Sequence, residues 1–389
     1  MTGDIELGYL LAVSAAAVCT PRPLAMWFDA LGGARPIIEY ARRHSALPPP
    51  GCEALGKAAL GRICTIDDRA ASDALSAMAD CGAFALTRQC ERYPSRLRQL
   101  SDAPLALYCR GDAAALAGRT IAIVGSRAAT QYGRSVTATL CRDFHVFDVT
   151  IVSGLARGID AAAHRGAIDG GLRTVAVIGS GLGALYPAYH SLLADDIVAG
   201  GGAVLSEFPP ALAAQAHQFP MRNRIVAALA DATVIVEAGA KSGALITARL
   251  ADEIGRPVFA IPGDVGRLTS QGTNALIADG VPLATCAAEI AQSLRWDERA
   301  RVDPSGGAED GAHGVASAAD PLVAQLQAGG STIDELSCAT GLDPATLAAR
   351  LTMLELGGMV ERQGGLFSAV NRGPSKKTAR DAHQLNRRR

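Results

Sequence analysis

The feature that most constrains this fold is a regular alternation of short apolar runs with helical stretches across residues 119–288. The runs are rich in β-branched residues, and none alternates apolar with polar positions. Strands that are buried on both faces of a parallel sheet have this continuous apolar pattern. The pattern therefore predicts right-handed βαβ units in a Rossmann-like α/β fold with a doubly wound, mostly parallel sheet. The six runs occupy residues 120–124, 150–152, 174–178, 203–205, 233–236 and 257–261.

The segments before this alternation predict a small helical domain followed by a connecting arm. Residues 1–75 show short helical patterns that are interrupted by prolines and glycines. The apolar run 10–18 follows acidic rather than basic residues and is too short to span a bilayer, so we expect a helix of this domain and no membrane insertion. Two more strands are expected near residues 83–86 and 105–109. The α/β domain is then placed at residues 80–295.

The C-terminal part of the chain predicts a linker, a second folded domain and a tail. Residues 296–320 are rich in glycine and alanine and lack periodicity, which is typical of a flexible linker. Residues 321–370 resume a helical pattern and end in a short predicted hairpin over 359–369, which is the outline of a winged helix. Residues 371–389 form a basic tail.

Two helix starts support the winged-helix interpretation. Thr332 and Glu335 have the spacing of a capping box, and Asp343-Pro344 combines an N-cap residue with a proline suited to the first turn. The second predicted helix carries Arg350 as its single positive charge. Because major-groove readers need several polar or basic side chains on the exposed face, we expect this module to contact protein or to regulate, rather than to read duplex DNA.

Charge and cysteine content limit the possible functions. The formal net charge is -1, and residues 119–285 carry 13 lysines and arginines against 13 acidic residues. Nucleic-acid binders usually have a basic excess, so any such excess must here be local. The nine cysteines include no C-x-x-C pair. This pattern disfavours a zinc site or a disulfide framework, and it favours a reducing cytoplasm. No metal and no cofactor are expected.

Loops that follow the predicted strands carry residues able to hold anions. Gly125-Ser126-Arg127 offers a flexible backbone, a hydroxyl and a guanidinium before a helix N-terminus. Ser153-Gly154 begins a similar loop after the second strand. The alternative for Arg127 is an ordinary turn with a surface arginine.

Two further segments complete this set. Phe219, Arg222, Asn223 and Arg224 lie in F-P-M-R-N-R at the start of a predicted helix, where arginines match phosphate oxygens and the ring can stack a base. The segment Lys241-Ser242-Gly243 begins the next helix. Because carboxyl ends of parallel strands share one edge, these residues are expected to hold a run of phosphates there.

Three other patterns suggest enzymes or cofactor sites. Residues 179–184 form a G-x-G-x-x-A, but it follows the third strand and a tight turn explains it better than a dinucleotide site. Lys241-Ser242 lacks the glycines of a P-loop, which disfavours nucleotide triphosphate hydrolysis. Asp160 and His164 lie one helical turn apart and allow acid–base chemistry, although a capping aspartate and a structural histidine explain them better.

Taken together, residues 92–285 closely resemble the DprA/Smf family of DNA-processing proteins. The matching stretches include IAIVGSRAATQYG, IVSGLARGIDAAAH, FPMRNRIVAALA and VIVEAGAKSGALITARLADEIGRPVFAIPGD, and they occur in family order. The resemblance implies an extended Rossmann fold and an N-terminal domain of the SAM or helix-hairpin-helix kind. It further implies a homodimer that binds single-stranded DNA and loads RecA recombinase during natural transformation, with contacts from Arg127 and Phe219.

A rival hypothesis is a nucleotide-cleaving enzyme on a related Rossmann variant. Phosphoribohydrolases carry a P-G-G-x-G-T-x-x-E loop, whereas this chain has Pro262-Gly263-Asp264-Val265-Gly266. Glu237 remains a conceivable general base in this reading. We therefore expect a binding and loading protein rather than an enzyme.

Overall fold

The computed structural model describes most of the chain and divides it into two compact units, Met1–Val302 and Asp303–Arg389. The predicted linker beyond Trp296, the helix start at Asp343-Pro344 and the tail 371–389 lie outside the described residues. The described residues are 2–44, 47–296, 326, 331–340, 347–348, 350–351, 360–363 and 366–369.

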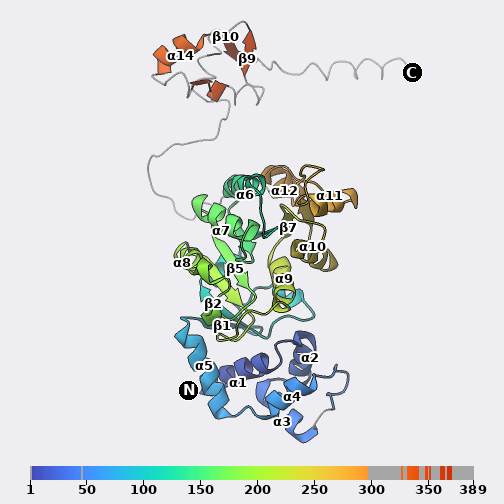
Figure 1. The fold of residues 1–389 in the computed structure, drawn as a ribbon. Helices are drawn as coiled ribbons and strands as arrows, with labels where there is room; N and C mark the ends of the chain where they lie inside the picture. Colours follow the sequence, from blue (N-terminus) through green and yellow to red (C-terminus); the bar gives the residue numbers. More distant parts are fainter. Residues whose placement is uncertain are drawn as a thin grey trace, which may run out of the picture. The chain divides into compact units, whose positions relative to one another are not determined.

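An eight-stranded mixed sheet forms the centre of the first unit (Figure 1), in the order β1-β2-β6-β5-β4-β3-β7-β8. Neighbours from β6 to β8 are parallel, whereas β2 is antiparallel to both β6 and β1. All eight predicted strands are confirmed, to within about two residues at each end. The strands are β1 Phe84–Thr87, β2 Ala106–Gly111, β3 Arg119–Val124, β4 Val149–Ser153, β5 Thr174–Ile178, β6 Ala203–Ser206, β7 Ala232–Ile235 and β8 Val258–Ala260.

Alternate residues of the parallel strands face different helical layers, because successive side chains of a strand point to opposite faces. Ile121 and Ile123 of β3 share a core with α6, α7 and α12, while Ala122 and Val124 share another with α9 and α10. This two-sided burial explains why the strands are apolar throughout. The helices that follow β3 are α6 Gln131–Asp143, α7 Ile159–Asp169, α8 Ser191–Ala199, α9 Gln218–Leu229, α10 Gly243–Glu253, α11 Gln271–Ala278 and α12 Ala287–Ser293.

The direction in which strands are added to the sheet reverses at β3. The chain proceeds from β3 through β4 and β5 to β6 on one side, and then places β7 and β8 on the other. Loops that follow β3 and β7 therefore begin on neighbouring strands and diverge to opposite faces. In open α/β sheets, such a switch point opens a crevice where ligands bind.

In the described residues before the sheet, five helices gather beside its β1–β2 end (Figure 1). Their apolar residues, including the fully buried Trp27, Ile37 and Ile63, belong to one hydrophobic cluster with Ala106 and Tyr108 of β2. The predicted small helical region is thus packed onto the α/β fold in a single unit. The helices are α1 Thr2–Ala16, α2 Pro21–Leu31, α3 Ala34–His44, α4 Lys57–Cys64 and α5 Asp68–Asp80.

The second unit contains α14 Ile333–Thr340 and a hairpin of β9 Val360–Gln363 with β10 Leu366–Ala369. The capping box before α14 is confirmed: the Thr332 amide donates to Glu335 Oε2 at 2.8 Å, and the Glu335 amide donates to Thr332 Oγ1 at 3.3 Å. Its small core combines helix and hairpin residues, among them Leu336, Leu351 and Phe367. The predicted hairpin is likewise confirmed.

Two negative findings apply to the described part of the chain. No helix there is long and apolar enough to cross a membrane. The eight cysteines whose side chains are described there are all free of disulfides.

Candidate nucleic-acid interface

A cleft of about 900 Å³ opens at the carboxyl ends of β3, β4 and β7, beside the point where the strand order reverses. It brings together loops that lie more than a hundred residues apart in the sequence. Ser153 and Arg224 are the predicted site residues that do not line it. The predicted residues that do line it are Gly125, Ser126, Arg127, Gly154, Phe219, Arg222, Asn223, Lys241, Ser242 and Gly243.

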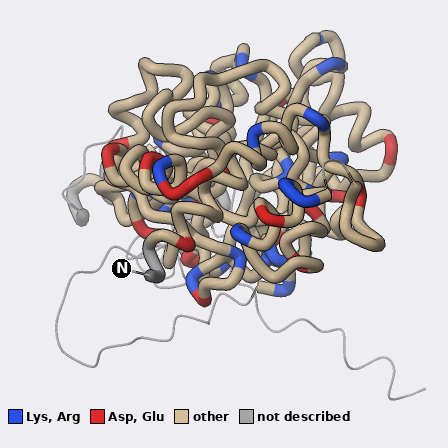
Figure 2. The backbone as a smooth tube through the Cα atoms, turned by 90° about the horizontal axis from the view of Figure 1, so that it is seen from below, with Lys and Arg blue, Asp and Glu red and all other residues tan. Residues whose placement is uncertain are grey.

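The cleft concentrates positive charge in a chain that has no overall excess. Basic and acidic positions are interspersed along the backbone in Figure 2. In contrast, the cleft is lined by Arg127, Arg157, Arg222 and Lys241 but by one carboxylate, Asp160. Arg127, Arg157 and Lys241 are exposed, and none of these three forms an ion pair with any described residue. The local basic excess required of a nucleic-acid binder is therefore present here.

Glycines lock the two loops that form the cleft wall after β3 and β4. A Cβ on Gly125 would lie 2.7 Å from Ile159 Cγ1, and one on Gly158 would lie 2.2 Å from the Ser126 carbonyl oxygen. Gly158 also has a φ of +87°, which favours glycine. The Ile159 amide donates to the same Ser126 oxygen at 3.1 Å. Gly125 therefore permits close packing of the two loops, and it also lines the cleft where it was predicted to admit a phosphate.

An aromatic and cationic surface lies beside these loops. The Arg127 guanidinium carbon is 4.9 Å from the centre of the half-buried Phe219 ring. The Tyr186 ring is 5.8 Å from Phe219 and tilted by 58°. Beneath them, Gly179 leaves room for the phenyl group, because a Cβ there would lie 3.0 Å from Phe219 Cδ1. Ring and guanidinium together offer a surface on which a base can stack.

Arg222 has a different role from the predicted phosphate contact. Its side chain is buried, and Nη1 donates to the Gly154 carbonyl at 2.7 Å and to the Val177 carbonyl. A Cβ on Gly154 would collide with this guanidinium, at 2.3 Å from Nη1. Burial lowers the pKa of Arg222 to about 10, so the group stays charged at neutral pH. Arg222 thus braces the ends of β4 and β5 and contributes charge to the cleft floor.

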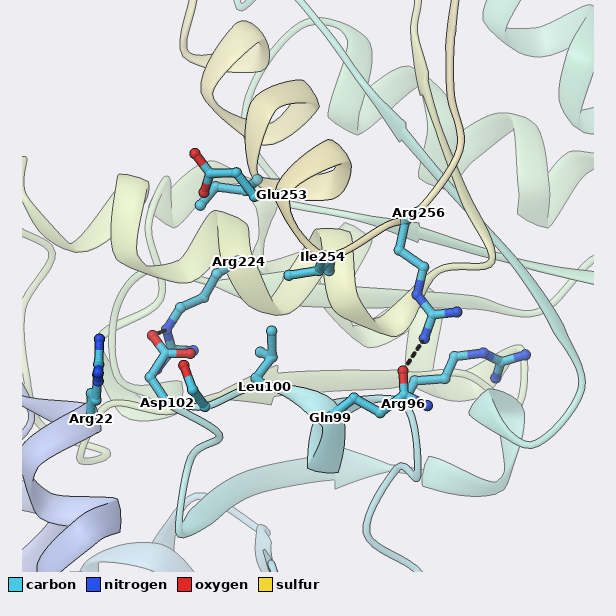
Figure 3. Close-up of a pocket in the computed structure, with 11 residues that line it drawn as sticks. Arg22, Arg96, Gln99, Leu100, Asp102, Arg224, Glu253, Ile254 and Arg256 are labelled. Atoms are coloured by element: carbon cyan, nitrogen blue, oxygen red, sulfur yellow. Dashed lines mark hydrogen bonds and ion pairs between the residues drawn. The ribbon is translucent and has the colours of Figure 1, made fainter.

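The prediction for Arg224 also requires correction. Two residues along a helix correspond to a rotation of about 200°, so Arg224 leaves α9 on the side opposite Arg222. Its Nη2 donates to both carboxylate oxygens of Glu207, at 2.7 and 2.9 Å, and its Nε lies 2.8 Å from Asp102 Oδ2. Figure 3 shows Arg224 reaching toward Asp102 in a separate pocket. With two carboxylate partners and 8% exposure, this guanidinium holds the fold.

The remaining predicted polar residues are either held by hydrogen bonds within the protein or accessible at the cleft. Ser153 is fully buried and donates to the Ile123 carbonyl at 2.6 Å, so it joins β4 to β3 rather than facing a ligand. Ser242 is the N-cap of α10 and accepts from the Ala244 amide at 3.3 Å. Asn223 and Lys241 remain accessible at the cleft.

The candidate acid–base groups are committed to structural hydrogen bonds. His164 is fully buried with Nδ1 2.7 Å from Thr174 Oγ1, which itself donates to the Ile151 carbonyl. Since the Thr174 hydroxyl proton is used there, His164 must donate through Nδ1. Asp160 accepts hydrogen bonds from the amides of Gly154 and Ala156, and burial raises its pKa. The structural interpretation is therefore confirmed for His164. The predicted helix cap is wrong, because Gly158 is the N-cap residue of α7 and Asp160, inside the helix, binds amides of the preceding loop.

Two features of the rival hypotheses are also explained by packing. Glu237 is buried and accepts from the Thr130 amide at 2.9 Å and from the Thr130 hydroxyl at 2.5 Å, so it fastens α6 to the end of β7. A Cβ on Gly181 would lie 2.1 Å from the Pro209 carbonyl oxygen. The backbone of the segment after β6 thus packs closely against this turn, in agreement with the tight-turn interpretation.

Sequence reasoning missed two residues of the cleft, Arg157 and Tyr186. Arg157 lies in the loop after β4, four residues beyond Ser153, and is exposed at the cleft. Tyr186 follows the G-x-G-x-x-A turn and precedes Pro187. Arg157 could have been predicted from the sequence, because it lies in the anion-holding loop that begins at Ser153-Gly154. Tyr186 could not, because its approach to Phe219 depends on the tertiary structure.

Comparisons with known proteins agree with this architecture. The family model described as DNA recombination-mediator protein A matches residues 84–295, and that of the DprA winged helix domain matches residues 307–365. The second match confirms the predicted C-terminal winged helix.

Individual proteins show the same relationship. A putative DNA processing protein DprA of Mycobacterium tuberculosis is 40% identical over 293 residues, which cover 74% of either chain. Protein Smf of Escherichia coli is 42% identical over 206 residues, covering 53% of this chain and 55% of that protein. The X-ray structure of DprA from Streptococcus pneumoniae matches with a TM-score of 0.63 and 31% identity, over 74% of this chain and 97% of that one. This chain therefore belongs to the DprA/Smf family of DNA recombination-mediator proteins.

Proposed function

We propose that this protein binds single-stranded DNA in the cleft at the carboxyl edge of its sheet. The observation that carries the proposal is the set of exposed cations in a cleft with an aromatic surface. Arg127, Arg157 and Lys241 line the same cleft as Phe219 and have no acidic partner within the described residues. Cations hold the phosphates of a strand, and rings stack its bases without regard to sequence. The same cleft offers both kinds of contact.

Single-stranded DNA fits this arrangement better than a duplex does. In a duplex the bases are paired and stacked on one another, so their faces do not reach a ring on the protein surface. Arg127 lies directly on the Phe219 ring, so a phosphate and its attached base would be held side by side. The backbone turns at Gly125 and Gly243 would supply further contacts.

The family description points to what the bound strand is for. A recombination mediator hands DNA to a recombinase, and several relatives are named DNA processing proteins. We infer that this chain acts as a homodimer in the cytoplasm and loads RecA recombinase onto the strand during transformation. Binding through exposed, solvent-screened cations suits such a transfer, because contacts of this kind are individually weak.

A catalytic role is not part of the proposal. Of the groups considered for acid–base chemistry, Glu237 and His164 are buried, held by Thr130 and Thr174 respectively, and do not line the cleft. Asp160 does line it, but its carboxylate is buried and accepts hydrogen bonds from the Gly154 and Ala156 amides. The protein would therefore act by binding, without chemical change to the nucleotide.

The direct test is the affinity of the full chain for fluorescent oligo-dT and for a matching duplex, at two salt concentrations. We expect tighter binding to the single strand, with an affinity that falls steeply as salt rises. Arg142→Ala, which removes an exposed arginine at the far end of α6, is the matched control and should bind as the wild type does. Duplex binding as tight as single-strand binding would sink the proposal.

A further inference from the structure

The segment between β5 and α8 carries an unusual pair of exposed rings. Aromatic residues make up only 4% of the chain. Three tyrosines in the described residues are largely exposed, Tyr132 at 45%, Tyr186 at 53% and Tyr189 at 67%. Two of the three therefore lie within four consecutive residues; Tyr186 lines the cleft, and Tyr189 follows it three residues later.

Hydrogen bonding separates these two tyrosines from the third. Tyr132 donates its hydroxyl proton to the Pro262 carbonyl at 2.8 Å, and so it helps to fix α6 to the loop after β8. Tyr186 and Tyr189 make no hydrogen bond to any described residue. Because neither burial nor a polar contact accounts for them, their ring faces remain open to a ligand.

The backbone beneath the pair is held firmly. His190 is buried, its Nδ1 lies 2.8 Å from the Leu155 carbonyl oxygen, and its amide donates to the Pro187 carbonyl at 2.9 Å. The Tyr189 ring meets the His190 ring edge-on, at 4.6 Å between centroids. The segment is thus fastened to the loop after β4, which also belongs to the cleft. A fixed segment loses little conformational freedom when a ligand stacks on it.

The Tyr186 ring continues the surface that begins at Arg127. Arg127 covers Phe219, and Tyr186 lies next to Phe219 with its plane tilted by 58°, so the two rings are not stacked on each other. Tyr189 follows three residues later in the short helical turn Ala188–His190. A strand held at Phe219 could run on along this segment and away from the cations.

We propose that Tyr186 and Tyr189 form an aromatic platform for the bases that adjoin the one held at Phe219. This inference rests on the proposed single-stranded DNA function and gives the cations and the rings separate roles in it. The cations set the salt dependence of binding, whereas the aromatic platform sets the preference for unpaired bases. The ligand chemistry is that of an unpaired nucleobase of any sequence, since every base has a face that can stack.

The test pairs side-chain removal with base removal. The affinities of the wild type, Tyr186→Ala, Tyr189→Ala and Tyr186→Phe are measured for oligo-dT and for an abasic oligonucleotide of the same length. Tyr132→Ala is the matched control, because it removes an exposed tyrosine on α6, outside the segment that carries Tyr186 and Tyr189. On oligo-dT, Tyr186→Ala should weaken binding about fivefold or more, and Tyr186→Phe should retain most of the affinity.

On the abasic strand, Tyr186→Ala and Tyr189→Ala should bind as the wild type does, and their salt slope should be unchanged. An equal loss on both strands would reveal a folding defect and overturn the inference. Full affinity of both alanine variants for oligo-dT would also overturn it, and would leave the exposed rings to a protein partner. In either case, salt-dependent wild-type binding to oligo-dT would keep the proposed function intact, whereas no such binding would remove both.

Discussion

Two groups of cations in the first unit have the same chemistry and opposite surroundings. In the pocket of Figure 3, Arg96 lies 2.7 Å from Asp231 and Arg224 lies 2.7 Å from Glu207. In the cleft, Arg127 and Arg157 have no carboxylate partner among the described residues. The cations of the first group form ion pairs within the protein, whereas those of the second are free to bind a ligand.

The comparison teaches that pairing, rather than residue type or motif, decides what an arginine does. A buried arginine needs a carboxylate or several carbonyls because an isolated buried charge is costly. An exposed arginine without a partner keeps its full hydrogen-bonding capacity for phosphate oxygens. Arg222 is intermediate, since carbonyl oxygens hold it while it still lines the cleft.

The largest effect should come from removing Arg224, the buried member of the paired group. Arg224→Ala leaves Glu207 buried without its cation, and we expect a loss of about 3–5 kcal/mol in the free energy of unfolding. The measurement is urea denaturation followed by circular dichroism. Stability close to that of the wild type would mean that the Arg224 pairs do not hold the fold.

A second substitution sharpens this prediction. Glu207→Gln in the Arg224→Ala background removes the unpaired charge, and so it should recover part of the lost stability. Arg249→Ala is the matched control, because Arg249 pairs with Glu253 at an exposed site on α10. Such surface pairs contribute about 1 kcal/mol or less.

A smaller effect on stability is expected from the buried imidazole of His164. Burial, with Arg222 nearby, lowers the pKa of His164 to about 3, below its ordinary 6.5. As the pH falls below 6.5, His164 takes up a proton in the unfolded chain but stays neutral in the folded one. The free energy of unfolding therefore falls progressively toward pH 3. Between pH 7 and pH 5 this costs about 2 kcal/mol.

The variant His164→Gln isolates this contribution. Its stability should decline less than that of the wild type over the same pH range, as measured by urea midpoints at pH 7 and pH 5. Parallel declines in the two proteins would show that His164 is not the group responsible.

The smallest effect on stability should come from the cleft. Arg157→Ala removes an exposed, unpaired side chain, so the free energy of unfolding should change by no more than about 0.5 kcal/mol. Its salt slope for oligo-dT should nevertheless fall by about 0.7, the value of one phosphate contact on a single strand. An unchanged slope would remove Arg157 from the proposed interface.

The sequence predicted the scaffold well because parallel strands are buried on both faces. A run such as that of β5 has no solvent-facing position, so its continuous apolar character identifies it without knowledge of its neighbours. The capping box at Thr332 is equally local, since both of its hydrogen bonds span three residues. Features whose physical cause lies within one segment were therefore predictable.

The arginines of α9 were not predictable in this way. Arg222 and Arg224 lie two residues apart at a helix start, but their partners come from distant segments: Gly154 and Val177 for the first, Asp102 and Glu207 for the second. The sequence does not reveal which side of α9 faces the sheet. The F-P-M-R-N-R motif predicted where the cleft lies, whereas only the tertiary structure shows which of its cations face the cleft.

The most direct test of this division is the combined variant Arg127→Ala, Arg157→Ala and Lys241→Ala, compared with the wild type in two measurements. If exposed, unpaired cations bind the strand, the salt slope of oligo-dT binding should fall by about 2 while the urea midpoint stays unchanged. An unchanged salt slope, or a loss of stability as large as that of Arg224→Ala, would contradict the assignment of this cleft to DNA.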